Sequence, residues 1–351
     1  RLPVEFSYSV ERRECQQTAR VHPHPNPNPE SDLHRVELHC HFEGALRPST
    51  VFNIAKRRGH KLPVATPEEF AEFMRRKEPS LLREFLSYFP VLMSFVAGDP
   101  DGIVQLAVDF IEDCAKNKIA YIESSCSPKT PSLPRTGCRL CCEDSSWARN
   151  EFCDETLRLA KAYANHGVVG IDVAGDDKED YDSERGGTHP DIVRLFQEAY
   201  KAGIHRTAHA GENSGAEMVT EALDSLHAER IGHGYHTLDN PTLYQRILHD
   251  RVHLETCPLS SHLTSAVLTD WPHHPIQRLA ADKANYSINT DDPTLTGQWL
   301  DAEYRMCLDR IGLPPWELVR TNYCAARSSF LPEEEKADLI AQLDAYYRVR
   351  L

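Results

Sequence analysis

RVELHCHFEG, residues 35–44, alternates polar and apolar side chains as a strand does and carries two histidines one residue apart. Residues i and i+2 of a strand point to the same face, so His39 and His41 can direct both imidazole rings at one point. The same spacing also occurs among ordinary surface or buried histidines. A metal site at the end of this strand is therefore a hypothesis that the rest of the chain has to support.

Short apolar runs of this kind recur along the chain, separated by longer amphipathic stretches. After residues 35–40, strands are expected at residues 119–126, 138–142, 168–175, 203–211, 230–234, 251–258 and 285–293. Helical patterns lie between most of them, for example at residues 189–202 and 215–226, and residues 332–351 are expected to form a closing helix. Alternating strands and helices predict a parallel sheet, and eight such strands predict a closed (β/α)8 TIM barrel of the α/β class.

The N-terminal part of the chain has a different composition. VHPHPNPNPE, residues 21–30, has proline at every second position over part of its length, which prevents helix formation and strand pairing. We therefore expect residues 1–33 to be a disordered N-terminal extension and residues 34–351 to form a single barrel domain. A chain of 351 residues suits one α/β barrel.

Charge and cysteine content limit the partners and the compartment. The formal net charge of -14 repels phosphate backbones and anionic lipids, and no apolar run is long enough for a membrane span. We expect a small-molecule substrate, no nucleic acid and no membrane, and leave open a cell-surface protein partner. The 11 cysteines, mostly without paired spacing, fit free thiols in a reducing cytosol. A cytoplasmic location is expected, and an extracellular or surface-associated pool is left open.

Polar residues gather at the expected strand ends, which in a (β/α)8 barrel meet at one mouth and build the active site. They are His39 and His41 of the first strand, His209 and Glu212 after the fifth, His233 after the sixth, and Asp291 and Asp292 after the eighth. Imidazoles with one carboxylate suit Zn2+, and a catalytic zinc keeps a position open for water.

We predict that His39, His41, His209 and Asp291 hold the ion, which activates a water molecule for attack. His233 is then placed to orient this water, Glu212 to transfer a proton and Asp292 to bind the substrate. Each of these three also has a plainer interpretation, as a packed histidine, a carboxylate at a helix N-terminus and a helix cap, respectively.

Several motifs resemble the animal form of adenosine deaminase, a zinc-dependent barrel enzyme family of the amidohydrolase superfamily. They are VELHCHFEGALRP (36–48), GIHRTAHAGE (203–212), ERIGHGYHTL (229–238), CPLSSHLT (257–264), ANYSINTDDP (284–293) and AARSSFLPEEEK (325–336). The resemblance covers about residues 35–350. It implies hydrolysis of adenosine and 2'-deoxyadenosine to inosine and 2'-deoxyinosine with release of ammonia. It also implies one Zn2+ per chain, because the fourth strand offers no lysine before Lys178 to bridge a second metal.

The resemblance assigns roles to individual residues. Glu212 would give a proton to purine N1 while water attacks C6, and His233 would stabilise the attacking group. Asp292 would bind N7, the backbone of Gly175 would bind N3, and His41 and Glu43 would also contact the substrate. LLREFLSYF, residues 81–89, resembles a hydrophobic gate, with four side chains on one helical face, although such a stripe is also typical of plain core. The gate residues are Leu82, Phe85, Leu86 and Phe89.

The chain departs from the family pattern in three places. Glu43 replaces the usual aspartate that contacts the ribose, which sets the carboxylate one methylene further out. SSCSP, residues 124–128, stands where the family has an Arg-Tyr-Ser-Pro-like sequence, so any support from that arginine is expected to be lost. The connection between the second and third strands, residues 127–137, is too short for the usual crossover helix. The missing helix is expected to leave apolar surface on the barrel. This surface either destabilises the barrel or is covered by the N-terminal arm, unless the missing helix reflects an incomplete transcript.

Two other functions remain as alternatives to adenosine deamination. The first is a catalytically impaired nucleoside-binding relative, damaged by the short connection. The second is a deaminase for a related substrate such as N6-methyl-AMP, AMP or adenine. A full set of metal ligands together with a proton-transferring glutamate favours catalysis, because a binding protein needs neither.

Overall fold

A computed structural model describes residues 34–126, 137–143, 149–175, 181–182 and 187–347. The chain divides into two compact units, Arg1–Asp32 and Leu33–Leu351. The first unit lies outside the described residues. The disordered extension expected at residues 1–33 therefore stays a prediction.

Eight strands form one sheet in the order β1-β2-β3-β4-β7-β8-β9-β10, and all paired neighbours run parallel. They are β1 (Arg35–His41), β2 (Ile119–Cys126), β3 (Gly137–Glu143), β4 (Val168–Ala174), β7 (His205–Ala210), β8 (Arg230–His233), β9 (His253–Thr256) and β10 (Tyr286–Ile288). The first strand meets the last through a parallel bridge between Cys40 and Asp291. The predicted eight-stranded parallel barrel is confirmed.

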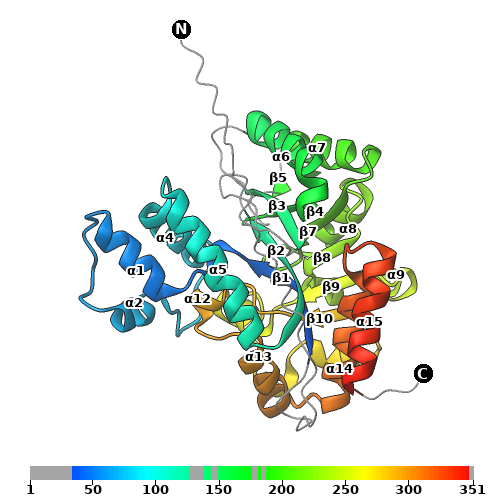
Figure 1. Ribbon diagram of the computed structural model, residues 1–351. Coiled ribbons are helices and arrows are strands. Elements are labelled where there is room, and N and C mark those ends of the chain that lie inside the picture. The colour runs from blue at the N-terminus through cyan, green and yellow to red at the C-terminus, as the bar shows by residue number, and fades with distance from the viewer. Residues whose placement is uncertain (1–33, 127–136, 144–148, 176–180, 183–186, 348–351) are drawn as a thin grey trace. The chain divides into compact units, whose positions relative to one another are not determined.

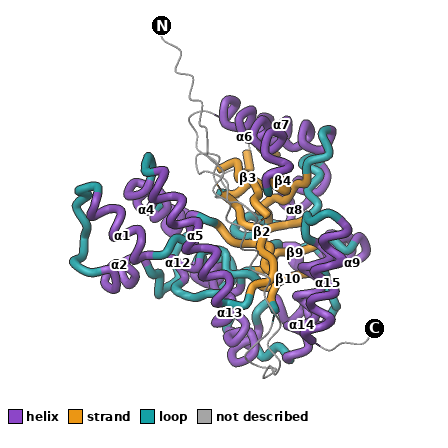
Figure 2. The backbone as a smooth tube through the Cα atoms, viewed as in Figure 1, coloured by secondary structure: helices purple, strands orange, loops and turns teal. Residues whose placement is uncertain are grey.

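Helices surround the strands, which gather at the centre (Figures 1 and 2). Those that follow or precede the barrel strands are α5 (Pro100–Lys116), α6 (Arg149–Tyr163), α7 (Pro190–Lys201), α8 (Ala216–Asp224), α9 (Pro241–Asp250), α11 (Ile276–Ala281), α14 (Pro315–Ser328) and α15 (Glu333–Tyr347). Further helices are α1 (Pro48–Arg57), α2 (Pro67–Met74), α3 (Leu82–Leu86), α4 (Tyr88–Val96), α10 (Pro258–Leu263), α12 (Pro293–Thr296) and α13 (Leu300–Met306). A small antiparallel pair, β5 (Tyr181–Asp182) and β6 (Gly187–Thr188), stands apart from the barrel sheet. No described helix is long and apolar enough to cross a membrane, and the cytoplasmic location stays a prediction.

The connection between β2 and β3 is short, as the sequence indicates, because β2 ends at Cys126 and β3 begins at Gly137. Residues 127–136 lie outside the described residues. The preceding helix α5 exposes an apolar row to solvent, with Val104, Val108 and Ile111 at 60%, 46% and 40% exposure. These positions are spaced by a helical turn, so α5 carries an apolar side that the described residues leave uncovered.

One pair of cysteines differs from the expectation of free thiols. Cys126 at the end of β2 and Cys138 of the neighbouring parallel strand β3 form a disulfide, although the register pairs Cys138 with Ser124 and Cys126 with Leu140. The free cysteines of the described residues are all buried: Cys40, Cys114, Cys153, Cys257, Cys307 and Cys324. Buried thiols of this kind behave as small apolar core residues.

Candidate metal and catalytic site

Side chains from the ends of four strands converge at one place in the barrel. His39 lies on β1, His209 on β7 and His233 at the end of β8, and Asp291 lies just after β10. All four side chains are buried, and each offers a ligand atom within 4.8 Å of the others. Residues far apart in the sequence thus form one group of metal-ligand type.

His41 belongs to the same convergence. Its Nε2 atom lies 3.2 Å from His209 Nε2 and 3.2 Å from Asp291 Oδ1, and His39 Nε2 lies 3.2 Å from the same Asp291 oxygen. His233 Nε2 is further from Asp291, at 3.8 Å from Oδ2. The structure therefore brings together the four predicted ligands, and it places His233 close beside them.

Hydrogen bonds on the far side of two rings fix which nitrogen faces the centre. Nδ1 of His39 lies 2.7 Å from Glu255 Oε2. Nδ1 of His209 lies 3.0 Å from the carbonyl oxygen of Val173 and 3.2 Å from Asp172 Oδ1. Carboxylate and carbonyl oxygens accept hydrogen bonds, so each Nδ1 carries the proton and donates. The Nε2 atoms of both rings are thereby left to face the other ligand atoms.

These contacts require a cation or a proton between the ligand atoms. The Nε2 atom of His41 lies 3.2 Å from both His209 Nε2 and Asp291 Oδ1, and lone pairs that face each other at this distance repel. In the absence of a metal His39 carries a proton toward Asp291: burial lowers the pKa of His39, but the carboxylates of Asp291 and Glu255 outweigh it and raise this pKa to about 9. Three imidazole nitrogens and one carboxylate oxygen form a donor set that fits Zn2+.

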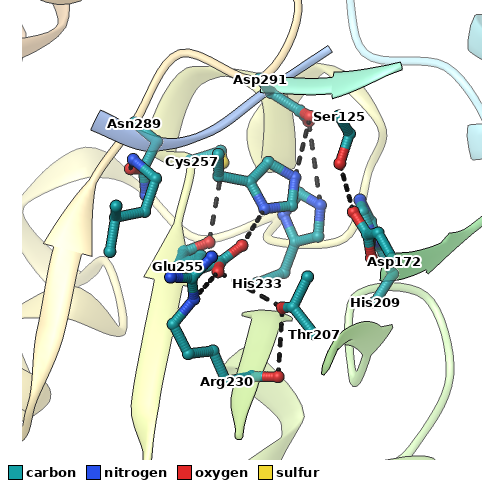
Figure 3. A network of polar contacts seen from close by, with 12 residues as sticks. Ser125, Asp172, Thr207, His209, Arg230, His233, Glu255, Cys257, Asn289 and Asp291 are labelled. Atoms are coloured by element: carbon teal, nitrogen blue, oxygen red, sulfur yellow. Dashed lines mark hydrogen bonds and ion pairs between the residues drawn. The ribbon is translucent and has the colours of Figure 1, made fainter. Parts of the chain in front are cut away.

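Figure 3 shows how the surrounding polar groups hold this cluster. Glu255 and Arg230 lie on one side of the imidazoles, and Asp172 with Ser125 lies on the other (Figure 3). On the Asp291 side, Ser260 Oγ donates to Asp291 Oδ2 at 2.7 Å. The ligand atoms are thus positioned by side chains that do not face the centre themselves, as in many metal sites.

Glu212 and His233 form a second feature next to the ligands. Glu212 is 3% exposed, its Oε1 accepts a hydrogen bond from Thr264 Oγ1 at 3.1 Å, and its Oε2 lies 3.4 Å from His233 Nε2. Burial holds the pKa of His233 well below its usual value, so this ring stays neutral. His233 and Asp291 both have a positive φ, 61° and 63°, which is uncommon for residues other than glycine and concentrates at functional sites.

Asp292 follows the predicted ligand Asp291 and is also buried. Burial and then the negative charge of Asp291 raise the pKa of Asp292 well above its usual range. Its Oδ1 atom has no hydrogen-bond partner among the described residues. A Cβ atom on Gly44 would lie 1.8 Å from this Oδ1, so glycine is required here to leave room for the carboxyl group. Glu43 is buried beside Gly44, and its charge acts on both Asp292 and His41.

Comparison with known proteins agrees with this geometry. The family model described as Adenosine deaminase matches residues 34–136 and 135–346. This chain belongs to the adenosine deaminase family. The two matched segments meet inside the short connection between β2 and β3. As a member of the family, the protein is a hydrolytic deaminase.

Individual members of the adenosine deaminase family match over nearly their whole length. The chain is 39% identical to an adenosine deaminase of Xenopus tropicalis, covering 89% of this chain and 95% of that protein. It is 38% identical to one of Danio rerio, covering 91% and 97%. Among solved structures, the adenine deaminase of Arthrobacter aurescens superposes with a TM-score of 0.76 at 26% identity, covering 90% of this chain and all of that one.

Gly44→Ala is expected to lower kcat/KM for adenosine about a hundredfold in this deaminase, because Asp292 would have to move by an ångström or more. Zinc content and melting temperature should change little, since the three atoms nearest to the added Cβ all belong to Asp292, which is not a predicted ligand. Steady-state kinetics, metal analysis and thermal unfolding check this. An equal loss of activity, zinc and stability would show general damage to the mouth of the barrel instead.

Gly175 follows β4 with a φ of 151°, a conformation that glycine adopts readily and other residues rarely. It lines, with Thr188, His209 and Met218 among others, a small hollow. The contact between the Gly175 backbone and the substrate stays a prediction, but the glycine lines the same hollow as His209, a predicted ligand.

The predicted gate segment is not one continuous helix. α3 ends at Leu86 and α4 begins at Tyr88, with the break at Ser87. Leu82 and Phe85 are buried, whereas Leu86 and Phe89 are half-buried. Just before them, Ser80 N donates to the carbonyl oxygen of Leu263 at 2.8 Å, which joins the segment to α10, the helix that carries Ser260. The gate role remains a prediction.

Sequence reasoning missed the groups that orient the ligands. Glu255 on β9 and Asp172 on β4 were not singled out, although both are charged residues inside apolar strands. A carboxylate at such a position needs a partner, which is the signal that could have found them. Burial disfavours ionisation of Glu255, but Arg139 and Arg230 hold its pKa well below the usual range.

Proposed function

We propose that this deaminase converts adenosine and 2'-deoxyadenosine to inosine and 2'-deoxyinosine, releasing ammonia, with one Zn2+ per chain. The observation that carries the proposal is the convergence of the four predicted ligands, from the ends of three strands, beside Glu212 and His233 of a fourth. The adenosine deaminases of frog and zebrafish, similar over nearly their full length, support adenosine as the substrate.

His39, His41, His209 and Asp291 would hold the ion. We assign His233 a catalytic role and not a ligand role. Its Nε2 atom lies 3.4 Å from Glu212 Oε2, which is closer than the 3.8 Å that separate it from Asp291 Oδ2. A zinc ion bound here would make water acidic enough to attack near neutral pH and would offset negative charge that develops during attack.

Proton transfer falls to Glu212. When water oxygen adds to C6 of the purine, the ring loses its conjugation and electron density moves onto N1. Glu212, held by Thr264, gives a proton to N1 and so neutralises that charge. The attacking water supplies two protons: one restores the carboxyl group of Glu212, and the other passes to the amino nitrogen, which leaves as ammonia when its bond to C6 breaks. His233, neutral and buried, orients the attacking water.

Three further groups would bind the nucleoside. Asp292 in its protonated form can donate to N7, which carries a lone pair and needs a donor. The N–H of Gly175 would donate to N3. Glu43 would accept hydrogen bonds from ribose hydroxyls, reaching further than the aspartate usual in the family.

The test is the fall in ultraviolet absorbance of adenosine with purified, zinc-analysed protein. We expect adenosine and 2'-deoxyadenosine to have kcat/KM values within about tenfold of each other, with adenine, AMP and N6-methyl-AMP at least about a hundredfold lower. Faster turnover of adenine would favour the activity named for the Arthrobacter enzyme. Zinc and adenosine binding without turnover would favour the impaired relative.

A further inference from the structure

Arg139 of β3 lies in the interior of the barrel and is fully buried, at 0% exposure. Its Nη1 atom is 3.1 Å from Glu255 Oε1 and 3.0 Å from Glu255 Oε2. Its Nη2 atom is 3.9 Å from Asp172 Oδ2. Glu255 and Asp172 are the carboxylates that hold Nδ1 of His39 and of His209. One guanidinium group therefore reaches both carboxylates that orient predicted ligands.

A purely structural role does not account for this arginine. Glu255 already has a second cation, because Arg230 Nε lies 2.7 Å from its Oε1. Two donors of Arg139, Nε and Nη2, are buried and have no hydrogen-bond partner among the described residues, which disfavours the folded state. No other lysine or arginine of the described part of the chain lies within 4.0 Å of Asp172. What Arg139 adds is a positive charge shared between Glu255 and Asp172.

The strand register places Arg139 next to the end of β2, where SSCSP, residues 124–128, lacks the arginine usual in the family. Ser125 of β2 pairs directly with Arg139 of β3, and its Oγ atom donates to Asp172. The loss of cationic support expected from the sequence SSCSP is therefore offset, because the neighbouring strand brings a guanidinium to the same level of the barrel.

We propose that Arg139 is a positioning residue for the metal ligands. Through Glu255 and Asp172 it keeps the Nδ1 protons of His39 and His209 directed away from the centre, so that both Nε2 atoms stay aimed at the ion. Arg139 touches neither substrate nor ion, and the inference rests on the proposed zinc site.

The test measures zinc affinity by competition with a chromophoric chelator, together with the visible spectrum of the Co2+-substituted protein. Arg139→Gln is expected to bind zinc about ten to a hundred times more weakly than the wild type and to change the intensities of the Co2+ bands. KM for adenosine should change less than about threefold while kcat falls, because Arg139 acts through the ligands and not on the nucleoside.

The matched control is Arg206→Gln. Arg206 is also a buried arginine on a barrel strand, but it pairs with Glu229, at 2.9 Å, and not with a carboxylate that holds a ligand histidine. This variant should lose stability as Arg139→Gln does, yet keep its zinc affinity within about twofold. Arg139→Lys keeps the positive charge but not the planar set of donors, so its zinc affinity is expected to be intermediate. It takes the place of Arg139→Gln in the test if that variant does not fold.

A relocation variant gives the sharpest readout. Arg139→Leu combined with Ser125→Arg places the guanidinium on the paired position of β2 and should recover most of the zinc affinity that Arg139→Leu loses. A folded Arg139→Gln or Arg139→Lys protein with wild-type zinc affinity and Co2+ spectrum would overturn the inference and leave the proposed function standing. A wild-type protein that binds no zinc would instead overturn the proposed function, and the inference with it.

Discussion

Glu212→Gln is expected to lower kcat for adenosine by about a hundredfold to ten-thousandfold while one zinc per chain stays bound. The amide keeps the shape of the side chain and its contact with Thr264, but it has no carboxyl proton to give to N1. Glu212 is not one of the predicted ligands, so the zinc site should be intact. Stopped-flow or steady-state assays with metal analysis of the same sample measure both quantities.

The control for this substitution lies five residues further along the chain. Glu217 stands in the first turn of α8 and is exposed, so Glu217→Gln makes the same chemical change away from the predicted ligands. It should leave kcat within about twofold. A Glu212→Gln protein with near wild-type kcat would show that another group protonates the purine and that the role proposed for Glu212 is wrong.

Removal of zinc by a chelator is expected to abolish turnover and to lower the melting temperature. Imidazole nitrogens and a carboxylate oxygen that face one another at 3.2 Å repel without a cation or proton between them. A ligand that binds the folded state alone stabilises it by about 2.7 kcal/mol at a hundred times its Kd, and the chelated protein loses this contribution. Activity and thermal unfolding, before and after zinc is added back, check the expectation.

The Glu212→Gln variant separates the two effects. Its melting temperature should fall as much on chelation as that of the wild type, because its ligands are unchanged, although it has little activity to lose. If chelation leaves the wild-type melting temperature and turnover unchanged, the convergence of His39, His41, His209 and Asp291 does not bind a metal that matters for function.

The sequence by itself was sufficient for the barrel and for the residues at its mouth. Strand and helix patterns are local, and the expected strand at residues 119–126 coincides with β2 (Ile119–Cys126). The expected strand at 285–293 was too long, since β10 covers Tyr286–Ile288 and the polar tail that follows forms the loop with Asp291. Parallel strands of a barrel all end at one mouth, so polar residues at strand ends could be assigned to one site before any contact was known.

Contacts between strands were decided by the tertiary structure. Glu255, Asp172 and Arg139 meet across the interior because β9, β4 and β3 have a particular register and direct these side chains inward. No local pattern encodes which buried charges face each other over more than a hundred residues of sequence. The same holds for Gly44 and Asp292. Glycine is required at position 44 only because β1 and the segment after β10 are side by side, which brings the Asp292 carboxyl group against it. Residue type and period predicted the ligands, whereas the distances between the ligand atoms depend on packing between segments that are distant in the chain.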